Sequence, residues 1–222
     1  MEQLIIKDAL TEDTINLHGQ EIAANEADEQ FGISEDVNFP FVDFSKNQKT
    51  FIIKGDVTVD SIAVTKQDWS PFNLIIDGNL TVLDTIDWNE WGNGSFLHVT
   101  GDITAKNLFL AGCPEVIVQG NLNVENGIVG SQGDNGGALM VFGKASSQLI
   151  YCTTYFNMEF PDRPEAFIIA DENDFMFDVD LDESDYESVT EKIVAECQPD
   201  DEGEIDVYVV KDFLAEGKSI FR

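Results

Sequence analysis

Positive charge is what this 222-residue sequence has least of. Lysine and arginine together number 12 against 43 aspartates and glutamates, which leaves a formal net charge of −31 and a pI near 4.1. So large an excess of acids repels the phosphates of nucleic acids and the headgroups of anionic membranes. We therefore predict no nucleic-acid and no membrane partner. The charge favours a basic partner, a cation or solubility alone.

Cysteine and long apolar runs are scarce as well. The three cysteines, Cys113, Cys152 and Cys197, include no Cys-x-x-Cys pair, and an odd number cannot pair completely into disulfides. No stretch approaches the length of a membrane span, and the N-terminus carries acids where a secretory leader needs bases and an apolar run. These features favour reduced thiols and a cytoplasmic protein.

What the sequence does contain is a repeat, which extends over residues 50–150. A glycine within an apolar-polar alternation recurs at spacings of 23, 23, 19 and 23 residues. A near-constant period of this length is typical of a solenoid, in which each repeat forms one coil. The glycines are Gly55, Gly78, Gly101, Gly120 and Gly143.

Every second side chain around these glycines is apolar. In the first repeat, Ile53, Val57 and Val59 alternate with the polar Lys54 and Asp56. Side chains of a strand alternate between its two faces, so each repeat contains a strand with one apolar face. One strand cannot bury such a face alone, whereas stacked copies form a parallel sheet with a continuous core. Glycine at an inward position suits a bend or a close backbone approach.

A second strand is expected in every coil, because a short apolar stretch follows each glycine-centred strand. With two strands in about 23 residues, the sequence predicts a mostly β protein built as a short parallel β-helix of about five coils. The apolar stretches contain Ile62 and Val64, Ile86, Leu108 and Leu110, Ile128 and Val129, and Leu149 and Ile150.

Residues 1–49 are predicted to cap the N-terminal end of this solenoid. An uncovered end exposes an apolar layer and a strand edge, which favours end-to-end association. Residues 4–6 and 15–17 have the apolar content of strands, and residues 23–30 are expected to form a helix that ends at Gly32.

Residues 151–222 are predicted to form a small acidic C-terminal cap of mixed β/α structure. Strands are expected at 166–170 and 205–210, and helices at 184–197 and 212–216. This segment either covers the far end of the solenoid or forms a separate subdomain.

Two acid-rich segments are the candidate partner-binding surfaces. Insertions in solenoids gather on one face, often the binding face, and tryptophans among acids would anchor a basic partner there. The first surface comprises Trp69, Asp84, Asp87, Trp88, Glu90 and Trp91, and the second comprises Asp178, Asp180, Asp182, Glu183 and Asp185.

No residue pattern predicts a metal, a cofactor or catalysis. An EF-hand loop from Asp178 would need glycine at its sixth position and glutamate at its twelfth, where the chain has Glu183 and Val189. Calcium binding in another geometry stays open. His18 and His98 have no partner at ligand spacing and are expected on the surface. Because nucleophile-elbow and phosphate-loop motifs are absent too, we predict no enzyme.

Two resemblances add to this prediction. The units IKGDVTV from Ile53 and VTGDITA from Val99 are similar to those of bactofilins, over residues 50–147. That resemblance implies a β-helical core and a self-assembling scaffold, although long loops and a heavy acid load depart from it. In composition, the chain resembles the immunity proteins that bacteria make against basic toxins.

The first functional hypothesis is a non-enzymatic acidic binding protein that docks or neutralises a basic protein, in its sharpest form a toxin-immunity protein. A bactofilin-like scaffold is the second. The third is a glycan-binding or glycan-cleaving β-helix, because Asp87 and Glu90 near tryptophans fit a sugar site.

Overall fold

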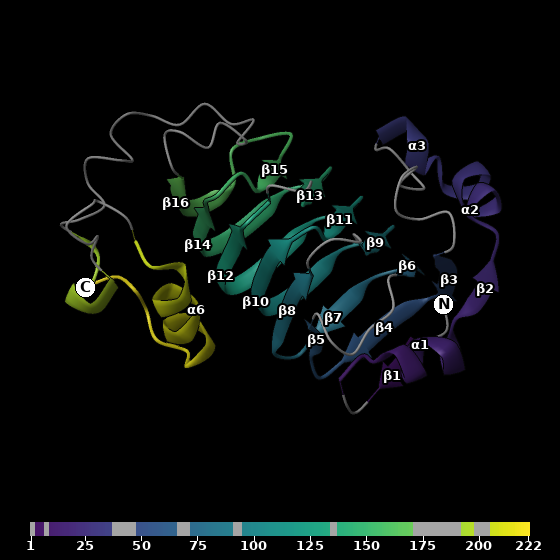
Figure 1. Cartoon of the computed structure of the whole chain (residues 1–222), viewed down its shortest axis with the longest axis horizontal. Coiled ribbons are helices and arrows are strands. Elements are labelled where there is room, and N and C mark those ends of the chain that lie inside the picture. Colours follow the sequence, from purple (N-terminus) through teal and green to yellow (C-terminus); the bar gives the residue numbers. More distant parts are fainter. Residues whose placement is uncertain are drawn as a thin grey trace.

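A computed structural model describes residues 3–6, 9–36, 48–65, 72–90, 95–133, 137–170, 192–197 and 205–222 of the chain. Within these residues the chain winds into a β-solenoid of about five coils, formed by two sheets whose inner faces share one core (Figure 1). Strands of neighbouring coils pair in parallel. The predicted mostly β, parallel β-helix is confirmed.

The two sheets are named A and B, and each coil contributes to both. Sheet A contains β1 (Gln3–Ile6), β4 (Asp56–Val59), β7 (Leu80–Val82), β10 (Ile103–Gly112), β12 (Leu122–Ser131), β14 (Ala145–Cys152) and β16 (Glu165–Ala170), with β5 (Ile62–Thr65) and β8 (Thr85–Glu90) beside this path. Sheet B contains β2 (Gln20–Ile22), β3 (Lys49–Lys54), β6 (Phe72–Asp77), β9 (Phe96–Val99), β11 (Glu115–Val118), β13 (Ala138–Val141) and β15 (Asn157–Glu159).

The inward positions predicted from the alternation are the core. Val57, Leu80, Ile103 and Leu122 pair in register across β4, β7, β10 and β12, and none is more than 1% exposed. The second strands also form as predicted, because β5, β8 and the later halves of β10, β12 and β14 contain the expected apolar stretches.

Each repeat glycine marks the corner where the chain passes from sheet B to sheet A. The expected single strand is therefore two strands, and in the first coil β3 ends at Lys54 while β4 begins at Asp56. A Cβ atom on Gly78 would lie 2.5 Å from the carbonyl of Gly55, and the Gly101 N–H donates to the Gly78 carbonyl at 2.9 Å. Only a residue without a side chain allows coils to approach so closely at this glycine corner.

The residues that follow the glycines form a hydrogen-bonded ladder along the same corner. The Asn79 N–H and side-chain amide both donate to Asp56 Oδ1 at 2.9 Å, and the Asp102 N–H donates to Asn79 Oδ1 at 2.8 Å. Asn121 donates in the same way to Asp102, and the Lys144 N–H donates to Asn121. Because acids and amides alternate, no two carboxylates stack on adjacent rungs of this ladder.

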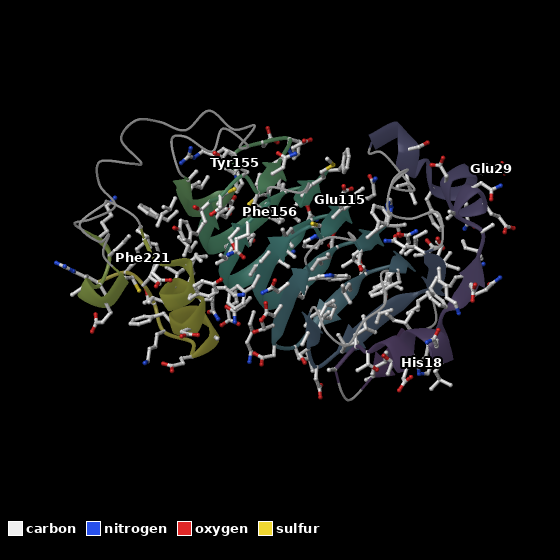
Figure 2. The ribbon with its side chains drawn as sticks, viewed as in Figure 1. His18, Glu29, Glu115, Tyr155, Phe156 and Phe221 are labelled. Carbon is white, nitrogen blue, oxygen red and sulfur yellow. The ribbon has the colours of Figure 1, made fainter. Side chains whose placement is uncertain are left out.

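The N-terminal segment extends both sheets and covers the outside of one. β1 pairs with β4 in parallel, and β2 pairs with β3 in the antiparallel sense. The predicted helix forms as α2 (Ala24–Phe31) and ends at Gly32, whose φ is 64°. With α3 (Ile33–Asp36), α2 packs on the outer face of sheet B, while its exposed acids, such as Glu29, point away from the solenoid (Figures 1 and 2).

The strand expected at residues 15–17 is wrong, because this segment lies in helix α1 (Glu12–His18). Thr11 and Thr14 cap the helix reciprocally: the Thr11 N–H donates to Thr14 Oγ1 at 2.7 Å and the Thr14 N–H donates to Thr11 Oγ1 at 3.3 Å. This capping satisfies backbone donors at the first turn, and Ile15 is buried beneath it.

The solenoid continues beyond residue 150, where the predicted repeat stopped. β15 pairs with β13 in sheet B, and the predicted strand at 166–170 forms as β16 and pairs with β14 in sheet A. The helix expected at 184–197 lies largely outside the described residues, and its end is a short 3-10 turn at Ala195–Cys197. Across the described parts of the chain, no helix is long and apolar enough to cross a membrane.

The strand expected at 205–210 is also wrong, because α6 (Val207–Ala215) begins there. Asp206 caps it by accepting the Tyr208 N–H at 2.8 Å, which favours helix over the strand propensity of the valines. α6 does not cover the end of the solenoid but packs against the outer face of sheet A (Figure 1). That face offers an apolar row of residues on successive strands, namely Phe109, Val129, Tyr151 and Ile169.

Candidate functional site

The first predicted surface is divided by the fold. Asp84 immediately precedes β8, and the other described members lie on β8, where alternation places Asp87 on the outer face and Trp88 in the core. Trp88 pairs in register with Val64 and Leu110, is 1% exposed and lies 5.8 Å from the Phe72 ring. Trp88 therefore cannot supply the surface contact that we predicted, because its ring fills the solenoid interior.

Asp84 and Asp87 both have partners within the chain. The Lys211 Nζ atom of α6 donates to Asp87 Oδ1 at 3.1 Å and lies 5.1 Å from the centre of the Phe109 ring. Asp87 thus fixes α6 against sheet A. Asp84 lies 3.5 Å from Lys106, but both side chains are more than half exposed, so this pair contributes little to stability.

The other predicted residues stay untested. Trp69, Trp91 and the whole second surface, Asp178, Asp180, Asp182, Glu183 and Asp185, lie outside the described residues. Glu90 is the last residue of β8, and its side chain is likewise outside the described part.

The outer face of sheet B contains a buried histidine and a half-buried glutamate that the sequence did not single out. His98 was expected on the surface but is 1% exposed, with its ring 6.0 Å from Phe31 and 6.2 Å from Phe96. The prediction failed because α2 covers this row. Glu115 lies in register with Phe96, on the same face (Figure 2). Burial raises the pKa of the Glu115 carboxyl to about 8, so it is largely protonated at neutral pH.

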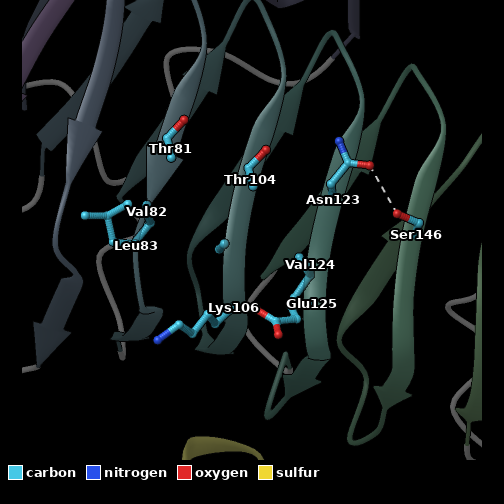
Figure 3. Close-up of a pocket in the computed structure, with 10 residues that line it drawn as sticks. Thr81, Val82, Leu83, Thr104, Lys106, Asn123, Val124, Glu125 and Ser146 are labelled. Atoms are coloured by element: carbon cyan, nitrogen blue, oxygen red, sulfur yellow. Dashed lines mark hydrogen bonds between the residues drawn. The ribbon is translucent and has the colours of Figure 1, made fainter. Parts of the chain in front are cut away.

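A shallow groove of about 370 Å³ crosses the outer face of sheet A (Figure 3). Its floor is a row of short polar side chains, Thr81, Thr104, Asn123 and Ser146, each paired in register with the next coil. Ser146 Oγ donates to Asn123 Oδ1 at 3.1 Å. Leu83, Lys106 and Glu125 line the groove beside this row.

Irregular strand pairing adjoins the groove. The register shifts between Ala105 and Asn107 on β10, and again between Asn123 and Gly127 on β12. Such bulges bend a strand and re-aim its side chains. The sequence predicted that the threonines point outward, but it carried no signal of this bend.

Chemically, the groove offers evenly spaced hydrogen-bond donors and acceptors, with the coils about 4.8 Å apart. Glu125 is the carboxylate and Lys106 the ammonium among its described lining residues. Glycoside hydrolysis by a carboxylate pair needs a second acid, which this lining does not contain. The described residues also contain no cluster of three or more metal-ligating side chains.

Comparisons with known proteins identify no relative. No family model, no curated protein and no solved structure matches the chain.

Proposed function

We propose that the chain is a non-enzymatic acidic binding protein that docks a basic protein. The charge balance carries this proposal. Even if each of the 12 lysines and arginines paired with one acid, 31 of the 43 acids would have no opposite charge within the chain. Surface acids in such excess attract a basic partner over long range and accelerate its association.

The lysines of the structure support this reasoning. Lys49 pairs with Glu21, Lys106 with Asp84, Lys211 with Asp87 and Lys218 with Glu216. Each of these four pairs is neutral as a whole, so the remaining acids stay in excess. A basic partner would therefore meet a surface of strongly negative net charge.

In its sharpest form, the proposal is that the chain is an immunity protein that neutralises a basic toxin in the cytoplasm. The test is to express the product of the gene directly upstream with and without this chain. We expect that product to be basic, to stop growth when expressed alone and to be tolerated with this chain. An upstream product that is acidic or harmless would contradict the immunity form.

The broader proposal is tested by binding. Lysozyme and cytochrome c serve as folded basic probes, and α-lactalbumin serves as an acidic control. We expect binding of the basic probes that weakens steeply as salt rises from 20 to 300 mM, since counter-ions screen such contacts over about 10 Å at 0.1 M. No binding of either basic probe at low salt would overturn the proposal.

The scaffold alternative requires accessible solenoid ends. At the N-terminal end, Leu10 and Ile15 are each 1% exposed, and the antiparallel edge strand β2 ends the parallel stacking of sheet B. This covering argues against end-to-end association at that end. Size-exclusion chromatography at several concentrations separates the two functions, because a scaffold would grow in size as concentration rises.

The groove favours glycan binding as a second candidate, since its floor is a row of hydroxyl and amide groups. A glycan array is the direct test, and a Thr104→Val variant removes one hydroxyl of the row while it keeps the side-chain shape. Binding that Thr104→Val weakens would support this candidate.

A further inference from the structure

An unusual corner of the solenoid lies between β12 and β13 and between β14 and β15. Three non-glycine residues there have left-handed backbone angles: Gln132 at φ 58°, Thr154 at 54° and Tyr155 at 59°. The Gly133 N–H donates to the Thr154 carbonyl at 2.8 Å, so these residues occupy neighbouring coils. Left-handed angles are unfavourable for residues with a Cβ atom, most of all for β-branched threonine, and such residues gather at functional sites.

One exposed tyrosine belongs to this corner, and a hydrogen bond joins a second tyrosine to it. The Tyr155 side chain is 51% exposed and lies toward the end of the solenoid opposite α2 (Figure 2). Tyr208, on the first turn of α6, is 58% exposed, and Gln132 Nε2 donates to its hydroxyl at 3.3 Å. The hydrogen bond joins α6 to the left-handed corner. Asp212 lies one helical turn after Tyr208, so the two share the exposed side of α6.

We propose that Gln132, Tyr155, Tyr208 and Asp212, the tyrosine surface, bind arginine and lysine side chains of the basic partner. This inference rests on the proposed function and assigns its contact surface. Tyrosine rings attract cations over their faces, and the Asp212 carboxylate adds an opposite charge beside Tyr208. Tyrosine is also among the residues that dominate binding energy at protein interfaces.

The occupant is a basic protein segment because of charge complementarity. Around the tyrosine surface the described exposed acids include Asp206 as well as Asp212, and the chain as a whole carries a charge of −31. An apolar or acidic segment would gain nothing from these carboxylates, whereas a guanidinium group can stack on a ring and pair with a carboxylate at once.

The first test locates binding by NMR. The chain is labelled with ¹³C in its four tyrosines and titrated with the peptide (Gly-Arg)₆. We expect the ring signals of Tyr155 and Tyr208 to shift and those of Tyr151, which is 6% exposed, to stay. The matched peptide with citrulline in place of arginine keeps the shape without the charge and should cause no shift.

The second test measures affinity for the same peptide by fluorescence anisotropy. Tyr155→Ala with Tyr208→Ala should weaken binding at least tenfold, whereas the double change to phenylalanine keeps both rings and should cost less than threefold. A control variant combines Leu17→Ala with Phe142→Ala, two residues that are 75% and 44% exposed elsewhere, and should bind as the unchanged chain does.

The outcomes separate the two proposals. If (Gly-Arg)₆ binds but the signals of Tyr155 and Tyr208 stay in place, or if the alanine variant binds as well as the control, the tyrosine surface is wrong and the proposed function stands. If neither the peptide nor the folded basic probes bind, the proposed function falls and this inference falls with it.

Discussion

Two corners of the same solenoid are built in opposite ways. At the glycine corner, residues without side chains allow backbones to approach, and the ladder from Asp56 to Lys144 satisfies the groups beside them. At the corner of Gln132, Thr154 and Tyr155, residues with side chains occupy backbone angles that glycine would adopt more easily. The first corner is arranged for stability, and the second retains side chains at a cost. That difference is why we assign binding to the second.

The largest effect is expected at the glycine corner from Gly101→Ala. The added methyl group would lie 2.7 Å from the Gly78 carbonyl oxygen and 2.4 Å from Asn79 Oδ1, in the middle of the stack. Since backbone on the neighbouring coil cannot move aside, we expect a loss of about 3 kcal/mol or more in the free energy of unfolding. Urea unfolding followed by circular dichroism measures it.

A matched change at the other corner sharpens this comparison. Gly133→Ala also meets backbone, with the new methyl 2.4 Å from the Tyr155 carbonyl oxygen, but next to the last coil of the stack. A loss from Gly133→Ala as large as that from Gly101→Ala would contradict the idea that the glycine corner is the more tightly constrained of the two.

The second effect tests the alternation of acids and amides. Asn79→Asp would place carboxylates on three successive rungs, at positions 56, 79 and 102, and remove the amide that donates to Asp56 Oδ1. We expect a loss of about 1 to 3 kcal/mol at pH 7 in low salt, and a smaller loss in high salt. The control is Asp102→Asn, which keeps an Oδ1 acceptor for the Asn121 N–H and removes a charge. If both variants unfold at the same urea concentration, repulsion along the ladder is unimportant.

The stacked core was readable from the sequence because its signal is strictly periodic. Ile53, Val57 and Val59 recur in each repeat with the same spacing, and inward and outward positions follow from strand geometry alone. The same alternation places Trp88 inward, two residues after Ile86, so its burial could have been predicted. We predicted an exposed position instead, because Trp88 has acids and another tryptophan as sequence neighbours.

Features that depend on contacts between distant segments were not readable. The first half of helix α6 was predicted as a strand because Val207, Val209 and Val210 are β-branched, whereas its second half agrees with the helix predicted at 212–216. The docking of α6 depends on outward apolar residues of four separate strands. Gly127 leaves room for Leu214, whose Cδ1 would lie 2.4 Å from an added methyl group, and nothing in the repeat marks that glycine. The register shifts beside the groove likewise appear only when coils stack.

A third prediction concerns Glu115, where partial burial of a carboxyl, and not backbone strain, lowers the stability of the folded state. Burial raises the pKa of this carboxyl to about 8, from 4.5 in the unfolded chain. The folded state therefore holds the proton more tightly, so the contribution of Glu115 to stability is fully present below pH 4.5 and is lost as pH rises to about 8. Glu115→Gln should remove this fall and stabilise the protein by about 1 to 3 kcal/mol at pH 9.

The comparison for Glu115→Gln is the pH dependence of urea unfolding in both proteins. Their stabilities should agree within error near pH 4, diverge progressively between pH 4.5 and 8, and differ by a constant amount at higher pH. Parallel curves across this range would show that Glu115 does not titrate abnormally.

The smallest effect on stability is expected from a glycine substitution at the second corner, which tests whether backbone strain there matters for binding. Thr154→Gly removes a β-branched side chain from a left-handed position and should raise stability by about 0.5 to 1 kcal/mol, although glycine also adds freedom to the unfolded chain. For a chain of this length, that gain raises the Tm by about 1 to 4 °C. Thr153→Gly is the matched control. Its backbone is not left-handed, so glycine there should lower the Tm.

If strain at Thr154 serves to hold Tyr155 outward, the more stable Thr154→Gly variant should nevertheless bind (Gly-Arg)₆ two- to fivefold more weakly, because a flexible residue no longer fixes the ring. A variant that is both more stable and equally tight in binding would show that the strained corner has no part in recognition.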